Sequence, residues 1–224
     1  MKKMNRVAAI VVLLVGLAAV PAMVTAQEVS VGADIVSSYV WRGTKFGEGA
    51  AVQPTVEFSS GGFAVGAWGS FGLAKDDAAE ADLYAGYSFD FGLYLGLTDY
   101  YFPVYYDDNG DLTYDDYLDS DNHYDEVNVG YETGPVSLSA NMFFGNNMED
   151  DKYFEVAYDF GLASVFVGAG DESYTVDGDF AICNVGISAE KEIEITDKYS
   201  LPLFGSFIVN PDSEQAYIVV GMSF

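Results

Sequence analysis

The sequence predicts an all-β protein, an antiparallel transmembrane β-barrel of about twelve strands that follows a cleaved signal peptide. Three observations predict it: an amino-terminal export signal, apolar residues at every second position through the rest of the chain, and short and long connections that alternate. Apolar residues make up 50% and aromatic residues 16% of the chain, which excludes a disordered acidic protein. The formal net charge of −26 excludes a nucleic-acid partner, because phosphate binding needs a basic surface.

The first 26 residues form the predicted signal peptide. Lys2, Lys3 and Arg6 precede an apolar run over residues 7–20, and Val24 and Ala26 are small residues suited to cleavage after Ala26. The run is shorter than the roughly 20 residues that span a bilayer, so we expect cleavage and not anchoring. Cleavage removes three basic and no acidic side chains, so the formal charge falls from −26 to −29. Residues 27–224 then form one barrel domain.

Period-two alternation predicts the strands. Between residues 136 and 144, for example, Val136, Leu138 and Ala140 alternate with Ser137 and Ser139, which places one apolar and one mixed face on a strand. No 3.6-residue periodicity and no long apolar run follows the signal peptide, so we expect no transmembrane helix. Strands are expected near 28–42, 50–59, 62–72, 80–90, 92–102, 123–132, 135–145, 152–160, 161–170, 179–190, 199–209 and 214–224.

The connections predict two different rims. Tight turns rich in glycine, aspartate and proline occur near 60–62, 90–92, 133–135 and 159–161, and longer polar links lie between them at 43–49, 73–79, 103–122, 146–151, 171–178 and 210–213. This alternation is typical of a barrel with one short-looped and one long-looped rim. The link at 191–198 is longer than a tight turn, so either two strands extend there or the strand count is wrong by one.

Four features favour a membrane barrel over a soluble one. The strands have the length of bilayer-crossing strands, and the mixed faces suit a wet lumen. Aromatic residues near strand ends, at Trp41, Tyr100, Tyr101, Phe102 and Tyr131, suggest an interfacial girdle. Tyr217 and Phe224 suggest a carboxyl-terminal insertion signal. We therefore expect the outer membrane of a Gram-negative-type bacterium, with its lipid and the barrel-assembly machinery as partners. A soluble periplasmic barrel that binds a small ligand is the alternative.

Several segments resemble one protein family. They are DIVSSYVWRG (34–43), GFAVGAWGS (62–70), DLYAGY (82–87), YYFP (100–103) and EVNVGY (126–131). They are similar to the TorF family of exported, porin-like proteins over most of the chain after residue 27. These glycine-aromatic motifs specify a fold and contain no catalytic signature. The resemblance implies an outer-membrane barrel with pore activity, and it brings no substrate and no site residues.

The inner face is the most informative candidate site. If the apolar face meets lipid, a few charged side chains line the lumen: Asp34, Arg42, Glu57, Asp82, Glu126 and Glu155. Excess carboxylates in a narrow channel favour cations. The expected function is a porin-like passive channel for small solutes with cation preference, with Arg42 either selecting ions or pairing with a carboxylate. A barrel of this size could also be plugged, which leaves a non-conducting structural or surface-interaction barrel as the alternative.

Other candidate chemistry is weak, and we expect neither enzymatic activity nor a cofactor. His123, the only histidine, has no accompanying hydrolase motif and is expected to be exposed in a loop. The acidic segment 105–126 places Asp107, Asn109 and Asp111 like the start of a calcium loop, but Leu112 and Leu118 occupy positions where an EF-hand requires glycine and glutamate. Loose attraction of divalent cations is the simpler expectation. Cys183 is the only cysteine and cannot form an intramolecular disulfide.

Overall fold

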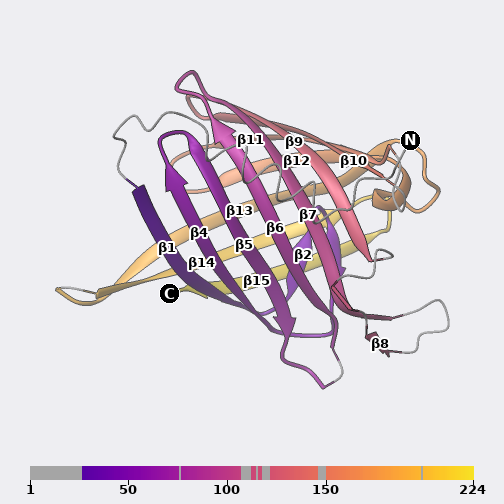
Figure 1. The fold of residues 1–224 in the computed structure, drawn as a ribbon, viewed down its shortest axis with the longest axis horizontal. Helices are drawn as coiled ribbons and strands as arrows, with labels where there is room; N and C mark the ends of the chain where they lie inside the picture. The colour runs from indigo at the N-terminus through magenta and orange to yellow at the C-terminus, as the bar shows by residue number, and fades with distance from the viewer. Residues whose placement is uncertain are drawn as a thin grey trace.

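Twelve antiparallel strands form one closed β-barrel in the part of the chain that the structure describes, as the alternation predicts (Figure 1). This computed structural model describes residues 27–75, 77–106, 112–114, 116–117, 122–145, 150–197 and 199–224, so the predicted signal peptide lies outside it. The wall strands are β1 (Gln27–Val36), β4 (Ala51–Ser60), β5 (Phe63–Gly72), β6 (Ala79–Ser88), β7 (Leu93–Tyr106), β9 (His123–Thr133), β10 (Val136–Phe144), β11 (Lys152–Asp159), β12 (Ser164–Gly170), β13 (Ala181–Thr196), β14 (Tyr199–Asn210) and β15 (Gln215–Ser223).

The wall closes on itself because the first and last strands pair. Each wall strand pairs with its neighbour in the sequence, and β1 pairs with β15 from Asp34 opposite Ser223 to Val36 opposite Gly221. The turns that join β4 to β5, β6 to β7, β9 to β10, β11 to β12 and β13 to β14 lie at one end, the short-turn rim. The longer connections lie at the opposite end, the long-loop rim. The even strand count places Gln27 and Phe224 at the short-turn rim.

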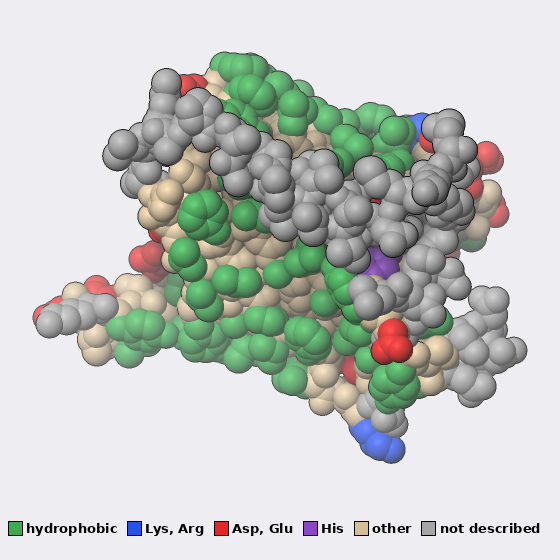
Figure 2. All heavy atoms as spheres, in the orientation of Figure 1, with side chains coloured by type: hydrophobic (Ala, Val, Ile, Leu, Met, Phe, Trp, Pro, Cys, Tyr) green, Lys and Arg blue, Asp and Glu red, His purple; other side chains and the backbone are tan. Residues whose placement is uncertain are grey.

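Side chains alternate between the outer and inner faces of the wall. Val156 on β11 is 46% exposed on the outer face, whereas its neighbour Glu155 bonds to Asn184 inside the barrel. The outer face carries exposed apolar side chains on strands all round the wall: Val29, Val31, Val56, Leu83, Tyr87, Leu95, Leu97, Leu138, Met142, Phe154, Val156, Val165, Val167, Ile187, Phe207, Ile218 and Val220. Figure 2 shows hydrophobic side chains gathered over the wall strands on the face in view. The barrel is therefore apolar outside.

The interior holds polar side chains and a second small sheet. Buried polar residues include Gln53, Ser70, Glu80, Asp82, Glu126, Asn141, Asn184 and Asn210. Between β1 and β4 the chain forms β2 (Tyr39–Trp41) and β3 (Thr44–Phe46), which pair with each other and with no wall strand. We call residues 39–46 the inner hairpin, because its side chains contact the inner face of the wall. A short strand, β8 (Leu112–Tyr114), extends the sheet at β7, and a 3₁₀ turn, η1 (Glu172–Tyr174), follows β12.

The predicted strand boundaries need two corrections. The strand expected over 28–42 ends at Val36, because the chain then turns into the barrel to form the inner hairpin. The predicted link at 191–198 is instead the end of β13 and the start of β14, which stay paired from Val185 opposite Val209 to Thr196 opposite Tyr199. The strands extend beyond their neighbours, so the count of twelve holds.

Cys183 departs from the simple alternation of β13. A bulge pairs Gly168 with Asn184 and Ala169 with Ile182, so Cys183 is an extra residue with no partner opposite it on β12. An extra residue places two successive side chains on one side of a strand. Cys183 and Asn184 are both buried, whereas Ile182 is exposed. The single thiol therefore lies in the interior and away from the outer surface.

Candidate functional site in the barrel interior

The inner hairpin turns at Arg42 and Gly43, which both have positive φ angles, 49° and 82°. Two successive positive φ angles define the type I′ turn that two-residue hairpins favour. Glycine adopts this conformation freely, and a Cβ at Gly43 would lie 2.0 Å from the carbonyl oxygen of Cys183. A positive φ is uncommon for arginine, so the contacts of its side chain must stabilise the turn.

Arg42 forms an ion pair with Glu126, which is fully buried on the inner face of β9. Arg42 Nη1 donates to Glu126 Oε1, and Nη2 donates to Oε2 over 3.0 Å. Glu126 also accepts hydrogen bonds from the Tyr100 hydroxyl over 2.9 Å and from Asn128 Nδ2 over 2.6 Å. The Tyr174 hydroxyl lies 3.3 Å from Glu126 Oε1 and 2.5 Å from Arg42 Nη1. The buried carboxylate is thus fully satisfied.

Aromatic rings enclose the guanidinium group of Arg42. Its central carbon lies 4.3 Å from the ring centre of Trp41 and 4.6 Å from that of Tyr153, distances at which cation–π attraction is significant. Burial lowers the pKa of Arg42, but its hydrogen bonds to Glu126 and its charge interactions with Glu126 and the neighbouring tyrosines together outweigh burial, so the net pKa rises and the side chain stays charged. Burial raises the pKa of the Tyr174 hydroxyl, which therefore stays protonated. The arrangement is a buried ion pair enclosed by aromatic rings.

The rest of the inner hairpin contacts other sides of the barrel. The Trp41 ring packs against Tyr100 on β7 and Phe143 on β10. The Tyr39 hydroxyl donates to Glu80 on β6 over 3.2 Å, and its ring lies 5.4 Å from that of Trp68 on β5. Asn210 Nδ2 on β14 donates to the Gly43 carbonyl over 3.2 Å. Because these contacts reach strands on opposite sides of the wall, the inner hairpin blocks the barrel at this level.

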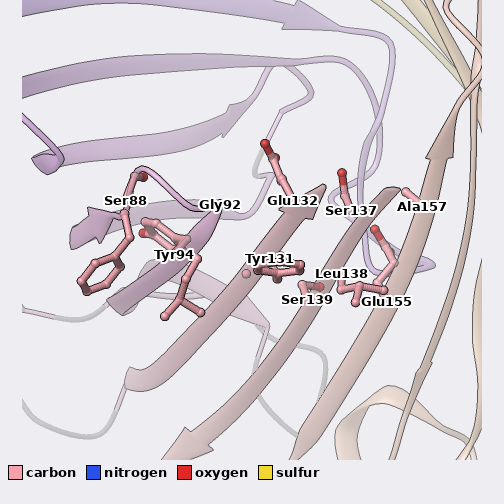
Figure 3. Close-up of a pocket in the computed structure, with 13 residues that line it drawn as sticks. Ser88, Gly92, Tyr94, Tyr131, Glu132, Ser137, Leu138, Ser139, Glu155 and Ala157 are labelled. Atoms are coloured by element: carbon pink, nitrogen blue, oxygen red, sulfur yellow. The ribbon is translucent and has the colours of Figure 1, made fainter. Parts of the chain in front are cut away.

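A wider space lies at the short-turn rim. A cavity of about 440 Å³ there is lined by residues of β7, β9, β10 and β11 and by the β6–β7 turn (Figure 3). Tyr94, Ser139, Ala157 and the two carboxylates Glu132 and Glu155 are among its lining residues. The barrel therefore has an acidic pocket at one end and is filled at the other.

All six predicted lumen residues lie in the interior, in different roles. Asp34 faces Gln53 across β1 and β4, and Glu57 accepts a hydrogen bond from Tyr84 over 2.9 Å. Asp82 is buried on β6, two residues after Glu80. Glu155 lies near the cavity. Arg42 and Glu126 pair with each other and do not line open space. This confirms one of the two expectations for Arg42, that it pairs with a carboxylate.

Sequence reasoning missed the partners that hold this pair. Tyr100, Asn128 and Tyr174 become recognisable only when the fold brings them together. One signal was present in the sequence. Arg42-Gly43 lies between two three-residue segments that contain aromatic residues, 39–41 and 44–46, and could have been interpreted as a hairpin turn. The expected aromatic girdle is also partly wrong, because Trp41 and Tyr100 pack inside the barrel. Tyr131 lies on the outer face.

The expectation of an exposed His123 is wrong. This residue begins β9 opposite Tyr101 and is 5% exposed. Its Nδ1 lies 2.8 Å from Asp99 Oδ1 and its Nε2 lies 2.7 Å from the Tyr117 carbonyl oxygen, while its ring stacks on that of Tyr101. Asp99 and Tyr101 belong to β7, and Tyr117 belongs to the connection that precedes β9, so His123 attaches this connection to the wall.

The remaining expectations concern metals and chain ends. Asp107, Asn109 and Asp111 lie outside the described residues, and the described residues contain no group of three or more potential metal ligands. In the same part of the chain no helix is long and apolar enough to cross a membrane, a result that concerns helices alone.

Tyr217 packs towards the interior and Phe224 is exposed beyond the end of β15. Their role as an insertion signal stays a prediction.

Comparison with known proteins gives one family. No curated protein matches the chain. The model of one bacterial family matches residues 21–199, a segment that includes the inner hairpin, Glu126 and most of the wall strands. The chain therefore belongs to the family described as bacterial protein of unknown function (Gcw_chp).

Proposed function

We propose that the protein is an outer-membrane β-barrel. The observation that carries this proposal is the distribution of side chains: exposed apolar residues surround the wall, and carboxylates and amides lie inside. A soluble barrel that binds an apolar ligand needs the opposite arrangement, with its apolar face inward. Lipid satisfies the exposed apolar surface, and the ring of strand pairs closes where β1 pairs with β15.

Cell fractionation tests the membrane location. We expect the protein in the outer-membrane fraction, and we expect its migration in detergent gels to change on heating, as that of a stable barrel does. Recovery of folded protein in the soluble fraction without detergent would instead support the periplasmic ligand-binding barrel.

We further propose that the barrel is a porin-like channel for small solutes that the inner hairpin closes in the present conformation. No strand pairing attaches the inner hairpin to the wall, since β2 and β3 pair with no wall strand. Displacing it breaks the Arg42–Glu126 pair and its other contacts with the wall, but no pairing between wall strands. The contacts of the inner hairpin with opposite walls equally favour the alternative, a barrel that never conducts. The proposal includes no catalytic step and no cofactor.

Cation preference follows from the charges of the interior. Glu57, Glu155 and Asp34 lie on the inner face, and Arg42 is the basic side chain that the described residues place there, already paired with Glu126. The low dielectric of a surrounding bilayer strengthens the field of unpaired carboxylates. The proposed solutes are therefore cationic or neutral.

Charge reversal tests this preference in an open barrel. In a variant whose residues 39–46 are replaced by a glycine-serine link, we expect currents carried mainly by cations. Adding Glu57→Lys and Glu155→Lys should shift the reversal potential towards anion preference. The matched control adds Glu214→Lys, an exposed residue of the long-loop rim, and should leave the preference unchanged. An unchanged reversal potential in the double-lysine variant would exclude these carboxylates as determinants of selectivity.

A further inference from the structure

The β13–β14 hairpin projects beyond the short-turn rim (Figure 1). The pairing of β12 with β13 ends at Ser164 opposite Ser188, whereas β13 continues to Thr196. The pairing of β15 with β14 ends at Met222 opposite Leu203, whereas β14 begins at Tyr199. Residues 189–196 and 199–202 thus form a two-stranded projection, which we call the projecting hairpin, and residues 189–195 of its β13 edge pair with no residue of β12.

The two edges of the projecting hairpin differ in their capacity to bind another strand. Pro202 lies on the β14 edge and has no N–H group, and proline on an edge strand hinders the addition of a further strand. The β13 edge, residues 189–195, contains no proline. Its unpaired N–H and C=O groups can therefore accept an additional strand.

Side chains of this part of β13 separate into two faces. Glu190, Glu192 and Glu194 occupy alternate positions and share one face, opposite Phe204, Pro202 and Ser200 of β14. None of the three carboxylates has a hydrogen bond or ion pair within the described part of the chain. On the other face Lys191 lies opposite Leu203 and Ile193 lies opposite Leu201. The edge thus combines a row of three unpaired negative charges on one face with apolar residues and a single lysine on the other.

We propose that the β13 edge of the projecting hairpin binds an extended segment of a partner polypeptide that carries lysine or arginine at every second position. Such a strand places its basic side chains beside the three glutamates and its alternate apolar side chains beside Ile193 and Leu201. Charge disfavours a second copy of this chain as the occupant, because a symmetric antiparallel pairing of two β13 edges brings two rows of glutamate together. This site is separate from the barrel interior and does not depend on conduction.

A synthetic peptide tests the proposal. The probe is a short labelled peptide of alternating lysine and valine, and its binding to the detergent-solubilised full chain is measured by fluorescence anisotropy. We expect the triple variant E190Q/E192Q/E194Q to bind about tenfold more weakly or worse. The control D177N/D179N/E214Q removes the same charge from exposed residues of the opposite rim and should change the affinity by less than about twofold.

Main-chain pairing is tested separately. The same peptide with alternate backbone nitrogens methylated keeps its charge but cannot extend a sheet, so we expect it to bind at least about tenfold more weakly. Each variant is first shown to keep its heat-modifiable migration. The proposal is overturned if the wild-type protein does not bind the unmodified peptide, if the triple variant binds as well as the wild type, or if methylation has no effect.

Discussion

Replacing Glu126 by leucine should lower the free energy of unfolding by about 3–5 kcal/mol, the cost of leaving a buried charge without its partner. Arg42 would remain enclosed by Trp41 and Tyr153 with no carboxylate to bind. The double variant R42M/E126L should recover most of this loss, because apolar side chains of similar volume often replace a buried ion pair at little cost. A double-mutant cycle with R42M alone gives the coupling energy.

Tryptophan fluorescence during denaturant unfolding measures this effect. Both tryptophans report on the inner hairpin, because Trp41 belongs to it and Trp68 packs against Tyr39. Glu132→Leu is the control, since Glu132 is exposed at the short-turn rim and its replacement should cost less than about 0.5 kcal/mol. If E126L and E132L unfold alike, the ion pair does not hold the inner hairpin.

Replacing Val156 by lysine should severely reduce membrane insertion. Val156 is 46% exposed in the middle of β11 on the apolar outer face, and a lysine near the bilayer midplane costs roughly 2–4 kcal/mol in barrels of this kind. The next residue, Ala157, lines the cavity together with Glu155, so the protein with Ala157→Lys should insert normally. The yield of heat-modifiable protein after refolding into lipid vesicles gives the comparison. Greater damage from A157K than from V156K would mean that the faces of the barrel are reversed.

The sequence predicted the wall well because strand alternation is a local property. Residues such as Leu138 and Ser139 show which face is apolar within a few positions, and turn residues show where each strand ends. The same pattern misled at the first strand. The apolar residues at odd positions from Val29 to Ile35 are followed in the same register by Tyr39 and Trp41, although the chain has already turned inward.

The site was harder to predict because its contacts join distant segments. Arg42 and Glu126 are 84 residues apart, and only the closed barrel brings them together. The sequence showed a lone basic residue among carboxylates and therefore predicted either pairing or selectivity. His123 was misplaced for the same reason, since its partner Asp99 lies 24 residues earlier on the neighbouring strand. Burial that depends on such pairs has no local signature.

Conductance with and without the inner hairpin tests the central claim, a membrane barrel closed from within. Wild-type protein and the variant with a glycine-serine link in place of residues 39–46 are compared in a planar lipid bilayer, after both are shown to be folded by heat-modifiable migration. The account predicts a nearly silent wild type and a stable, cation-preferring current in the variant. An equally conducting wild type would contradict closure by the inner hairpin, and a folded but silent variant would contradict the channel itself.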